Sequence, residues 1–175
     1  MNLDLSEVPS YSRPYFEKVG EADVLTLMRK NLSVFESFYR NIPKEKWDFA
    51  YAEGKWNIKE VLGHIIDSER IFQYRALRFS RDDQTDLPGF DQDLFVAAGN
   101  AKYRTPESLI EEYTQVRKAG LLLFENLSAE ELSRSGLANG FKVRVEWIAY
   151  MITGHEIHHI EILKERYGIN GISKV

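Results

Sequence analysis

The sequence predicts an all-α protein, a four-helix bundle with a long connection between its second and third helices. Four stretches place apolar residues at the three- and four-residue spacing of an amphipathic helix. No stretch shows the alternation or the turn pattern that we would expect of a β-hairpin. The 175 residues, of which 43% are hydrophobic, suffice for one sizeable core and are few for two. We therefore expect a single domain over residues 1–175.

The chain begins with a segment in which prolines stand among aromatic residues. Pro9 and Pro14 favour extended backbone, so residues 1–20 are expected to form an extended leader whose aromatic side chains clamp onto the bundle. From about residue 21 to residue 41, apolar residues recur at helical spacing, and Pro43 follows as a stop. This stretch predicts the first long helix.

The second long helix has a well-marked start. After a connection over residues 43–56, Asn57 is followed three positions later by Glu60, which is the pattern of a capping box. An apolar stripe then extends to Phe79. His64 lies at the edge of that stripe, where a lone histidine would by default be a core residue.

The third long helix follows a polar excursion. Residues 81–89 are expected to form a long loop, and Asp91 is a candidate cap for a short helix after it. This excursion lies where it could cover the mouth of a site. Thr105 then supplies a cap and Pro106 the first helical position, and the apolar stripe runs to Leu127.

Between the third and fourth long helices we expect a short helical turn and then a loop. Ser128 and Glu131 repeat the capping-box pattern, and Asn139 and Gly140 belong to the loop that follows. The fourth long helix has no clear capping residue, so its start is expected only within residues 143–145.

Charge and composition exclude several classes of function. The net charge of −4 provides no basic surface for nucleic acid. No run approaches the roughly 18 to 20 apolar residues of a membrane span, and the N-terminus lacks the pattern of a signal peptide, so we expect a cytoplasmic protein. The chain has no cysteine, which excludes disulfides, cysteine metal ligands and a cysteine nucleophile.

The last helix carries three of the four histidines. His155 and His159 are four residues apart, so both imidazoles can point at one ion from the same face of a helix. His158, three residues after His155, is the geometric rival of His159, although the two neighbours differ by about 100° around the helix. The apolar stripe on which His155 lies favours His159; it contains Ile148, Ile152 and Leu163.

Together with His64, this pair predicts one divalent metal ion held by His64, His155 and His159. Three imidazoles with a fourth position open to water are typical of catalytic zinc sites. Nearby carboxylates are candidates for orienting the free ring nitrogens. These candidates are Asp67, Glu69, Glu156 and Glu161. The stretch also invites comparison with the zinc-protease signature His-Glu-x-x-His, but the spacing from His155 to His158 is one residue too short for it, so we do not favour a metalloprotease.

Three motifs of the chain resemble a known family. Gly54-Lys-Trp-Asn-Ile-Lys-Glu-Val-Leu-Gly-His64, Leu87-Pro-Gly-Phe-Asp91 and Gly154-His-Glu-Ile-His-His159 occur in the order and at the separations of the DinB/YfiT-like superfamily of metal-dependent hydrolases and thiol transferases. The resemblance extends from the first helix to about Tyr167. It implies a four-helix bundle that holds a divalent ion, often nickel or zinc, through residues that match His64, His155 and His159 here. It implies no contact with DNA.

The resemblance also implies a kind of chemistry. Relatives include transferases and isomerases that use a low-molecular-weight thiol such as bacillithiol, mycothiol or glutathione, and dimers are common among them. We therefore expect a metal-dependent thiol S-transferase that acts on a small electrophile, with a second copy of the chain as partner. The thiol cosubstrate would bring the sulfur that a cysteine-free chain lacks. The alternatives are a metal-dependent hydrolase with a metal-bound hydroxide and a non-catalytic metal-binding module of a stress response.

Overall fold

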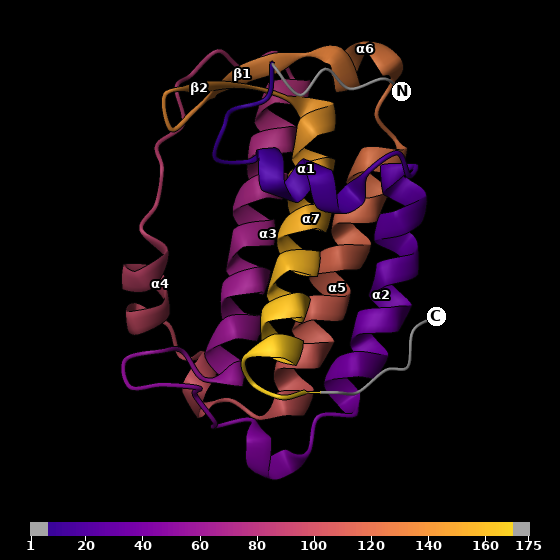
Figure 1. The fold of residues 1–175 in the computed structure, drawn as a ribbon. Helices are drawn as coiled ribbons and strands as arrows, with labels where there is room; N and C mark the ends of the chain where they lie inside the picture. The colour runs from indigo at the N-terminus through magenta and orange to yellow at the C-terminus, as the bar shows by residue number, and fades with distance from the viewer. Residues whose placement is uncertain (1–6, 170–175) are drawn as a thin grey trace.

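The computed structural model describes residues 7–169, which form seven α-helices, two short 3₁₀-helices and one β-hairpin (Figure 1). The α-helices are α1 (Arg13–Val19), α2 (Val24–Arg40), α3 (Ile58–Ser80), α4 (Gln92–Ala98), α5 (Pro106–Glu125), α6 (Ala129–Ser133) and α7 (Val145–Glu165). The 3₁₀-helices are Lys44–Lys46 and Ala101–Tyr103, and the strands are β1 (Ser135–Ala138) and β2 (Phe141–Arg144). The predicted helical fold is confirmed.

Four long helices, α2, α3, α5 and α7, form the bundle, as the sequence predicts. Contacts join α3 to α5 and α7, and α2 to α5 and α7, so α2 and α3 lie diagonally across the bundle although they are consecutive. The predicted long connection, residues 81–105, runs back along the bundle, so α3 and α5 point the same way (Figure 1). This topology places α3 beside α7, and these two helices carry all four histidines.

Side-chain caps mark the starts of α2, α3, α4, α5 and α6. The Asn57 side chain accepts a hydrogen bond from the Glu60 amide at 2.9 Å, and the Glu60 carboxylate accepts one from the Asn57 amide at 2.9 Å, which is the predicted capping box of α3. Ser128 and Glu131 form the second predicted box, at α6. Such caps satisfy amides that have no partner in the first turn, and each contributes about 1 kcal/mol. The residue at which α3 begins therefore determines how far along the bundle axis His64 lies.

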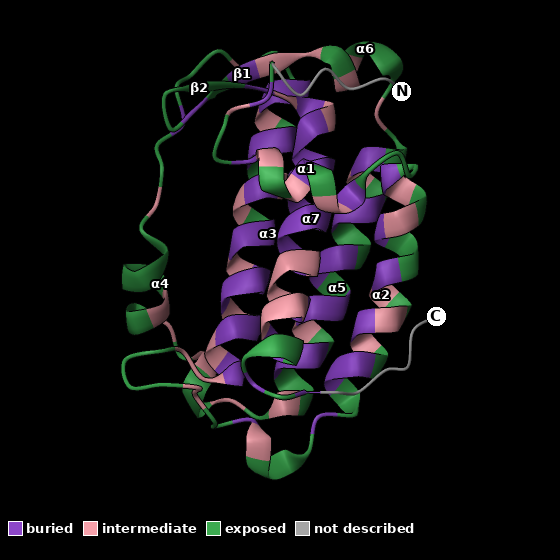
Figure 2. Ribbon diagram, viewed as in Figure 1, coloured by how far each residue is buried: buried purple, intermediate pink, exposed green. Residues whose placement is uncertain are grey.

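The faces that the long helices turn toward one another are apolar and buried (Figure 2). Five side chains from the four helices are at most 1% exposed: Met28, Phe38, Leu62, Leu109 and Ile148. Burying one such side chain stabilises the fold by about 1.5–3 kcal/mol, so this packing is the main source of stability. None of the helices between residues 7 and 169 has the length and apolar content of a membrane span.

The expectation of an extended leader over residues 1–20 is wrong for its second half. The chain forms α1 there, and Pro14 lies in the first turn of that helix, where its missing amide hydrogen has no partner to lose. Residues 1–6 lie outside the described part of the chain. The aromatic side chains of α1 do pack on the bundle, since the Phe16 and Tyr150 rings stack with centroids 5.3 Å apart.

The backbone of α1 approaches α7 closely at Gly154. A Cβ atom at this position would lie 2.0 Å from the carbonyl oxygen of Tyr15, a separation that real Cβ atoms do not show. Glycine therefore permits a contact that places the Tyr15 ring edge-on against His155, with centroids 5.5 Å apart. One glycine of α7 thus lets α1 cover the histidines.

The loop expected before the last helix is a β-hairpin instead. Strands β1 and β2 pair in antiparallel register, with Ser135 opposite Arg144. Asn139 (φ 53°) and Gly140 (φ 75°) form the two-residue turn, and Asn-Gly suits it because both positions require positive φ. The first amide of α7 donates to the carbonyl of Arg134 at 2.9 Å, so the hairpin base takes the place of a side-chain cap. The sequence prediction overlooked this Asn-Gly pair.

Replacing Gly154 with alanine should displace α1 from α7. The new methyl group meets main-chain atoms of Tyr15, which cannot move aside cheaply, so we expect a loss of about 1–3 kcal/mol in the free energy of unfolding. Urea denaturation followed by circular dichroism measures this loss. Gly120→Ala is the matched control, because its methyl group meets mainly the end of the flexible Gln73 side chain and lies no closer than 3.3 Å to the Glu69 carboxylate. Equal losses in the two variants would contradict the explanation.

Candidate metal centre

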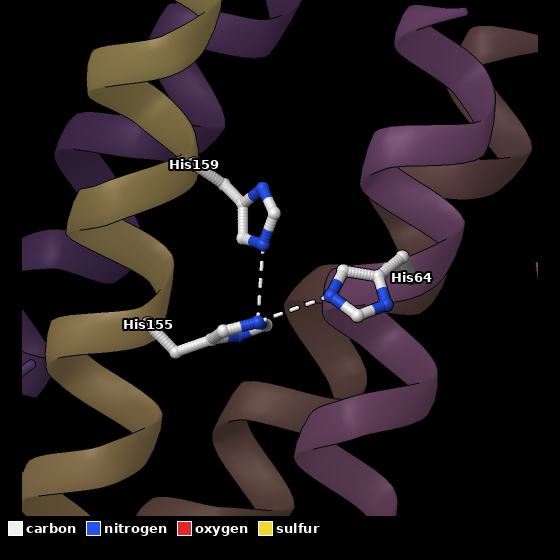
Figure 3. A group of neighbouring side chains, drawn as sticks. All are labelled: His64, His155 and His159. Carbon is white, nitrogen blue, oxygen red and sulfur yellow. Dashed lines mark hydrogen bonds between the residues drawn. The ribbon is translucent and has the colours of Figure 1, made fainter. Parts of the chain in front are cut away.

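Three histidine side chains from α3 and α7 converge on one point (Figure 3). The Nε2 atom of His155 lies 3.0 Å from Nε2 of His64 and 3.1 Å from Nε2 of His159. One ring nitrogen of each residue lies within 4.8 Å of the other two. The structure thus brings together the three residues that the sequence pattern selected.

The three imidazoles are shielded from water and are neutral. His64 is 3% exposed and His155 7%, and His159 is partly buried. Burial lowers the pKa of His64 to about 4. Burial, together with the neighbouring histidines, lowers the pKa of His159 to about 3 and the pKa of His155 well below its ordinary value. At neutral pH all three are therefore in the state in which imidazole binds a metal.

The three nitrogens cannot satisfy one another by hydrogen bonds alone. A neutral imidazole has one N–H donor and one acceptor nitrogen, whereas Nε2 of His155 faces the Nε2 atoms of both His64 and His159. A cation can accept all three lone pairs. Two imidazole nitrogens bound to one tetrahedral zinc ion are about 3.3 Å apart, which is close to the two measured separations. The arrangement fits a divalent ion with three protein ligands.

His158 does not belong to this group. Its ring lies on the flank of α7, with centroids 5.8 Å from Tyr15 and 5.2 Å from His159. Partial burial is the main cause that lowers the pKa of its imidazole. A rotation of about 100° between consecutive residues explains why His159, and not His158, faces His64.

Aromatic rings surround the three histidines. The Trp56 ring lies 4.8 Å from the His64 ring, and the Tyr15 and Phe72 rings lie 5.5 and 6.1 Å from the His155 ring. These rings exclude bulk water, which strengthens electrostatic interactions at the centre. Sequence reasoning missed Tyr15 and Trp56. Trp56 could have been found, because it precedes the cap of α3 in the family motif, whereas Tyr15 is too distant in the sequence.

The carboxylates predicted to orient the imidazoles do not do so, because none of the four forms a hydrogen bond to a histidine within residues 7–169. Glu161 pairs with Lys18 of α1, and Asp67 lines a cavity together with His64 without bonding to its ring. The polar group beside Nδ1 of His64 is the hydroxyl of Ser68, one turn later in α3, at 3.5 Å. A serine therefore stands where a carboxylate was expected.

Glu69 and Glu156 bind Arg117 in the centre of the bundle. The fully buried guanidinium of Arg117 donates to both carboxylate oxygens of Glu69, at 2.8 and 2.9 Å, and to Glu156 at 2.9 Å. The Tyr113 hydroxyl donates to the other oxygen of Glu156. Burial raises the pKa of Glu156, and Arg117 opposes that effect. These charge-assisted bonds join α3, α5 and α7.

The orientation of Glu156 bears on the protease comparison. His155, Glu156 and His159 do match the spacing of His-Glu-x-x-His, a match that the sequence prediction set aside. In that signature the glutamate is the general base beside the metal. Here Glu156 is fully buried and is bound by Arg117 and Tyr113, away from the ring nitrogens. Geometry, rather than spacing, argues against a metalloprotease.

Three cavities reach the histidines. One of them, of about 370 Å³, has a lining that includes His64, Asp67 and Arg104. The Arg75 cavity, of about 240 Å³, has a lining that includes Tyr15, His64, Ser68, Phe72, Arg75 and His155. The Trp56 cavity, of about 350 Å³, has a lining that includes Tyr51, Lys55, Trp56, His158, His159 and Arg166. Gln92, the first residue of α4, lines both the Arg75 cavity and the Trp56 cavity, so the long connection does cover the site as expected.

Comparison with known proteins agrees with this architecture. Residues 27–163 match the sequence profile of the DinB superfamily. The chain belongs to the DinB superfamily. The matched range contains all three converging histidines and nearly all of the bundle, so the resemblance stated from the sequence motifs is confirmed.

Individual DinB-like proteins show how far the similarity extends. A protein of Oceanobacillus iheyensis, provisionally described as a metal-dependent hydrolase, is 26% identical over 123 residues, which is 69% of either chain. YfiT from Bacillus subtilis, described in similar terms and with "an unusual four-helix bundle topology", aligns with a TM-score of 0.72 at 15% identity over 86% of this chain and 87% of YfiT. The mycothiol-dependent maleylpyruvate isomerase aligns with a TM-score of 0.66 at 14% identity over 83% of this chain and 61% of the isomerase. The two structural matches establish the DinB fold.

Without metal, this DinB-fold chain should lose stability in mild acid. His64 has a pKa of about 4 in the folded protein and about 6.5 when exposed, so the unfolded chain takes up the proton first. The stability is fully present above about pH 6.5 and is lost as the pH falls toward about 4. Between about pH 6.5 and about pH 5, His64 alone lowers the free energy of unfolding by about 2 kcal/mol.

Urea denaturation of the metal-free protein above and below this window measures the effect. His64→Gln is the control, because glutamine does not titrate and the variant should lose less stability on acidification. An identical pH dependence in the wild type and in the variant would contradict the assignment to His64.

Proposed function

We propose that this DinB-fold protein is a divalent-metal-dependent enzyme whose metal ligands are His64, His155 and His159. The observation that carries the proposal is the convergence of three neutral imidazoles between α3 and α7. Buried polar groups without partners are unfavourable, and a cation gives all three ring nitrogens a partner. The descriptions of the Oceanobacillus iheyensis protein and of YfiT support a metal. Zinc and nickel both suit imidazole ligands.

A divalent ion bound there would supply Lewis acidity that lowers the pKa of a thiol or of a water molecule. The residues of the chain have separate tasks. Burial keeps the three imidazoles unprotonated and available as ligands at neutral pH. Trp56 and Phe72 exclude water from them. Tyr15 lines the Arg75 cavity, and its hydroxyl, whose pKa burial raises further above neutral, can donate a hydrogen bond to a bound molecule.

The reaction that we favour joins a low-molecular-weight thiol to a small electrophile. The thiol loses its proton to solvent and its sulfur forms a bond to carbon. The electrophile either takes up the displaced electron pair and a proton from solvent, or releases a leaving group with that pair. The Arg75 cavity and the Trp56 cavity provide space for two reactants at the histidines. The chain has no cysteine, so the sulfur must come from a cosubstrate. The similar fold of the mycothiol-dependent isomerase supports such a cosubstrate.

Hydrolysis is the second candidate. The Oceanobacillus iheyensis protein and YfiT are both provisionally described as metal-dependent hydrolases. A hydrolase of this kind needs a base beside the activated water. Glu69 and Glu156 are bound to Arg117, and Asp67, which lines a cavity together with His64, forms no hydrogen bond to a histidine within residues 7–169. For this reason we place hydrolysis second.

Purified protein should carry about one divalent ion per chain. Replacing His64, His155 or His159 with alanine removes one of three ligands, so each variant should lose metal binding almost completely. Changes to groups that only orient a ligand typically cost roughly 10- to 100-fold in affinity. Elemental analysis and zinc titration of the metal-free variants measure the losses.

His158→Ala is the matched control, because it makes the same substitution one residue away from His159. It should keep the metal, since the His158 ring lies outside the converging group. Loss of metal in His158→Ala together with retention in His159→Ala would show that another face of α7 binds the ion.

Conjugation of a thiol to an electrophile should require the metal. With a fluorogenic electrophile such as monobromobimane and with bacillithiol, mycothiol or glutathione, we expect the rate above background to vanish on chelation and to return with zinc or nickel. The rate should rise with pH as the thiol loses its proton, because the three imidazoles are already neutral at neutral pH. Equal rates after exhaustive chelation would rule out this mechanism, and turnover of an ester without thiol would favour hydrolysis.

A further inference from the structure

Arg75 is a buried cation that lines the Arg75 cavity beside the histidines. It is 7% exposed, and its Nη2 atom donates to the carbonyl oxygen of Pro88 at 2.9 Å. A guanidinium carries five N–H donors, so one such bond leaves most of them without an acceptor from the protein. His64 and His155 line the same cavity. Arg75 therefore presents unused donors to the space that the predicted metal centre also faces.

Other buried cations of the chain have anionic partners. Arg117 is held by two carboxylates in the core, and Lys59 pairs with Asp48. Within residues 7–169 Arg75 takes part in no ion pair, and the group that acts on its charge is the hydroxyl of Tyr11. Burying a cation without an anion is unfavourable. The missing anion is therefore to be sought outside the described chain.

One face of α3 lines one side of the Arg75 cavity. Four residues at helical spacing lie on it: His64, Ser68, Phe72 and Arg75. Arg75 is about 20° from His64 around the axis and about 16 Å along it. Phe72 lies between them, and Phe90 and Met151 also line the cavity. The cavity thus combines the histidines, an apolar stretch and a cation.

We propose that Arg75 binds the carboxylate of the electrophilic substrate, and that this substrate is a small organic acid with an apolar body. The inference rests on the proposed function, because it names the substrate class of the same site. The planar fork of a guanidinium matches the two oxygens of a carboxylate. Among the described residues that line this cavity, Arg75 is the one lysine or arginine, so a single negative charge suits it better than a phosphate ester.

The carboxylate could belong to the thiol or to the electrophile. Phe72, Phe90 and Met151 suit a hydrocarbon or aromatic body, and a polar thiol such as glutathione would lose its hydration against them. The Trp56 cavity offers Lys55 and Arg166, which suit the more polar thiol. We therefore assign the carboxylate to the electrophile.

A matched pair of ligands tests the inference. Phenylacetate and phenylacetamide have nearly the same shape and differ in charge. Isothermal titration calorimetry of each into the metal-free protein avoids direct coordination of the acid by a metal. We expect the acid to bind at least about tenfold more tightly than the amide, because hydrogen bonds to a charged group are the stronger ones. Equal binding of the two ligands would overturn the proposal without any variant.

Variants test whether Arg75 causes the preference for the acid. Arg75→Gln removes the charge but can still donate to the Pro88 carbonyl, and it should abolish the preference for the acid. Arg75→Lys should keep part of it. Arg70→Gln is the matched control, because Arg70 is also on α3 but is half-exposed and pairs with Glu112. An acid preference that persists in Arg75→Gln, or that disappears equally in Arg70→Gln, would contradict the proposal.

Metal content separates this inference from the proposed function. Arg75→Gln should bind the same amount of zinc as the wild type, because Arg75 is not among the converging ligands. Absence of metal from the wild type would refute the proposed function, while the acid preference of the metal-free protein would still test Arg75. Competition between glutathione and phenylacetate in the wild type, absent in Arg75→Gln, would assign the carboxylate to the thiol and overturn its assignment to the electrophile.

Discussion

The ionic bridge from Arg117 to Glu69 and Glu156 is the constraint on which the position of the site depends. α3, α5 and α7 each supply one member, so sliding any of these helices by one turn would separate charges inside a low-dielectric interior. Breaking a buried pair of this kind typically costs about 3–5 kcal/mol. His155 is the residue before Glu156, and His64 lies on the same helix as Glu69. The bridge therefore fixes the register in which the two histidine-bearing helices meet.

Features that depend on forces within a single helix could be predicted from the sequence. The capping box of Asn57 and Glu60 was predictable because its bonds join residues three positions apart. The choice of His159 over His158 followed from the apolar stripe and the family resemblance, since the rotation between neighbours keeps both from facing one ion. The structure places His159 and not His158 beside His155. Convergence with His64 was also expected, while the metal itself stays a prediction.

The features that sequence reasoning missed depend on contacts between distant segments. The helix α1 forms where its backbone can rest on Gly154, a contact that no local pattern indicates. Glu69 and Glu156 were expected beside the histidines because they are close to them in the sequence, but Arg117 from another helix binds both. The β-hairpin is different in kind, since Asn139 and its glycine neighbour carried the pattern of the turn.

Part of the lining of the Arg75 cavity comes from segments that carry none of the three histidines. Tyr11 precedes α1, Gly89 and Phe90 belong to the long connection, and Asn139 is in the hairpin turn, whereas the histidines stand on the rigid helices α3 and α7. Substitutions in these three segments can alter which molecules fit without moving an imidazole. The fold is therefore adaptable. Exchanging these short segments, in evolution or by design, can change substrate preference while the three histidines and their chemistry stay the same.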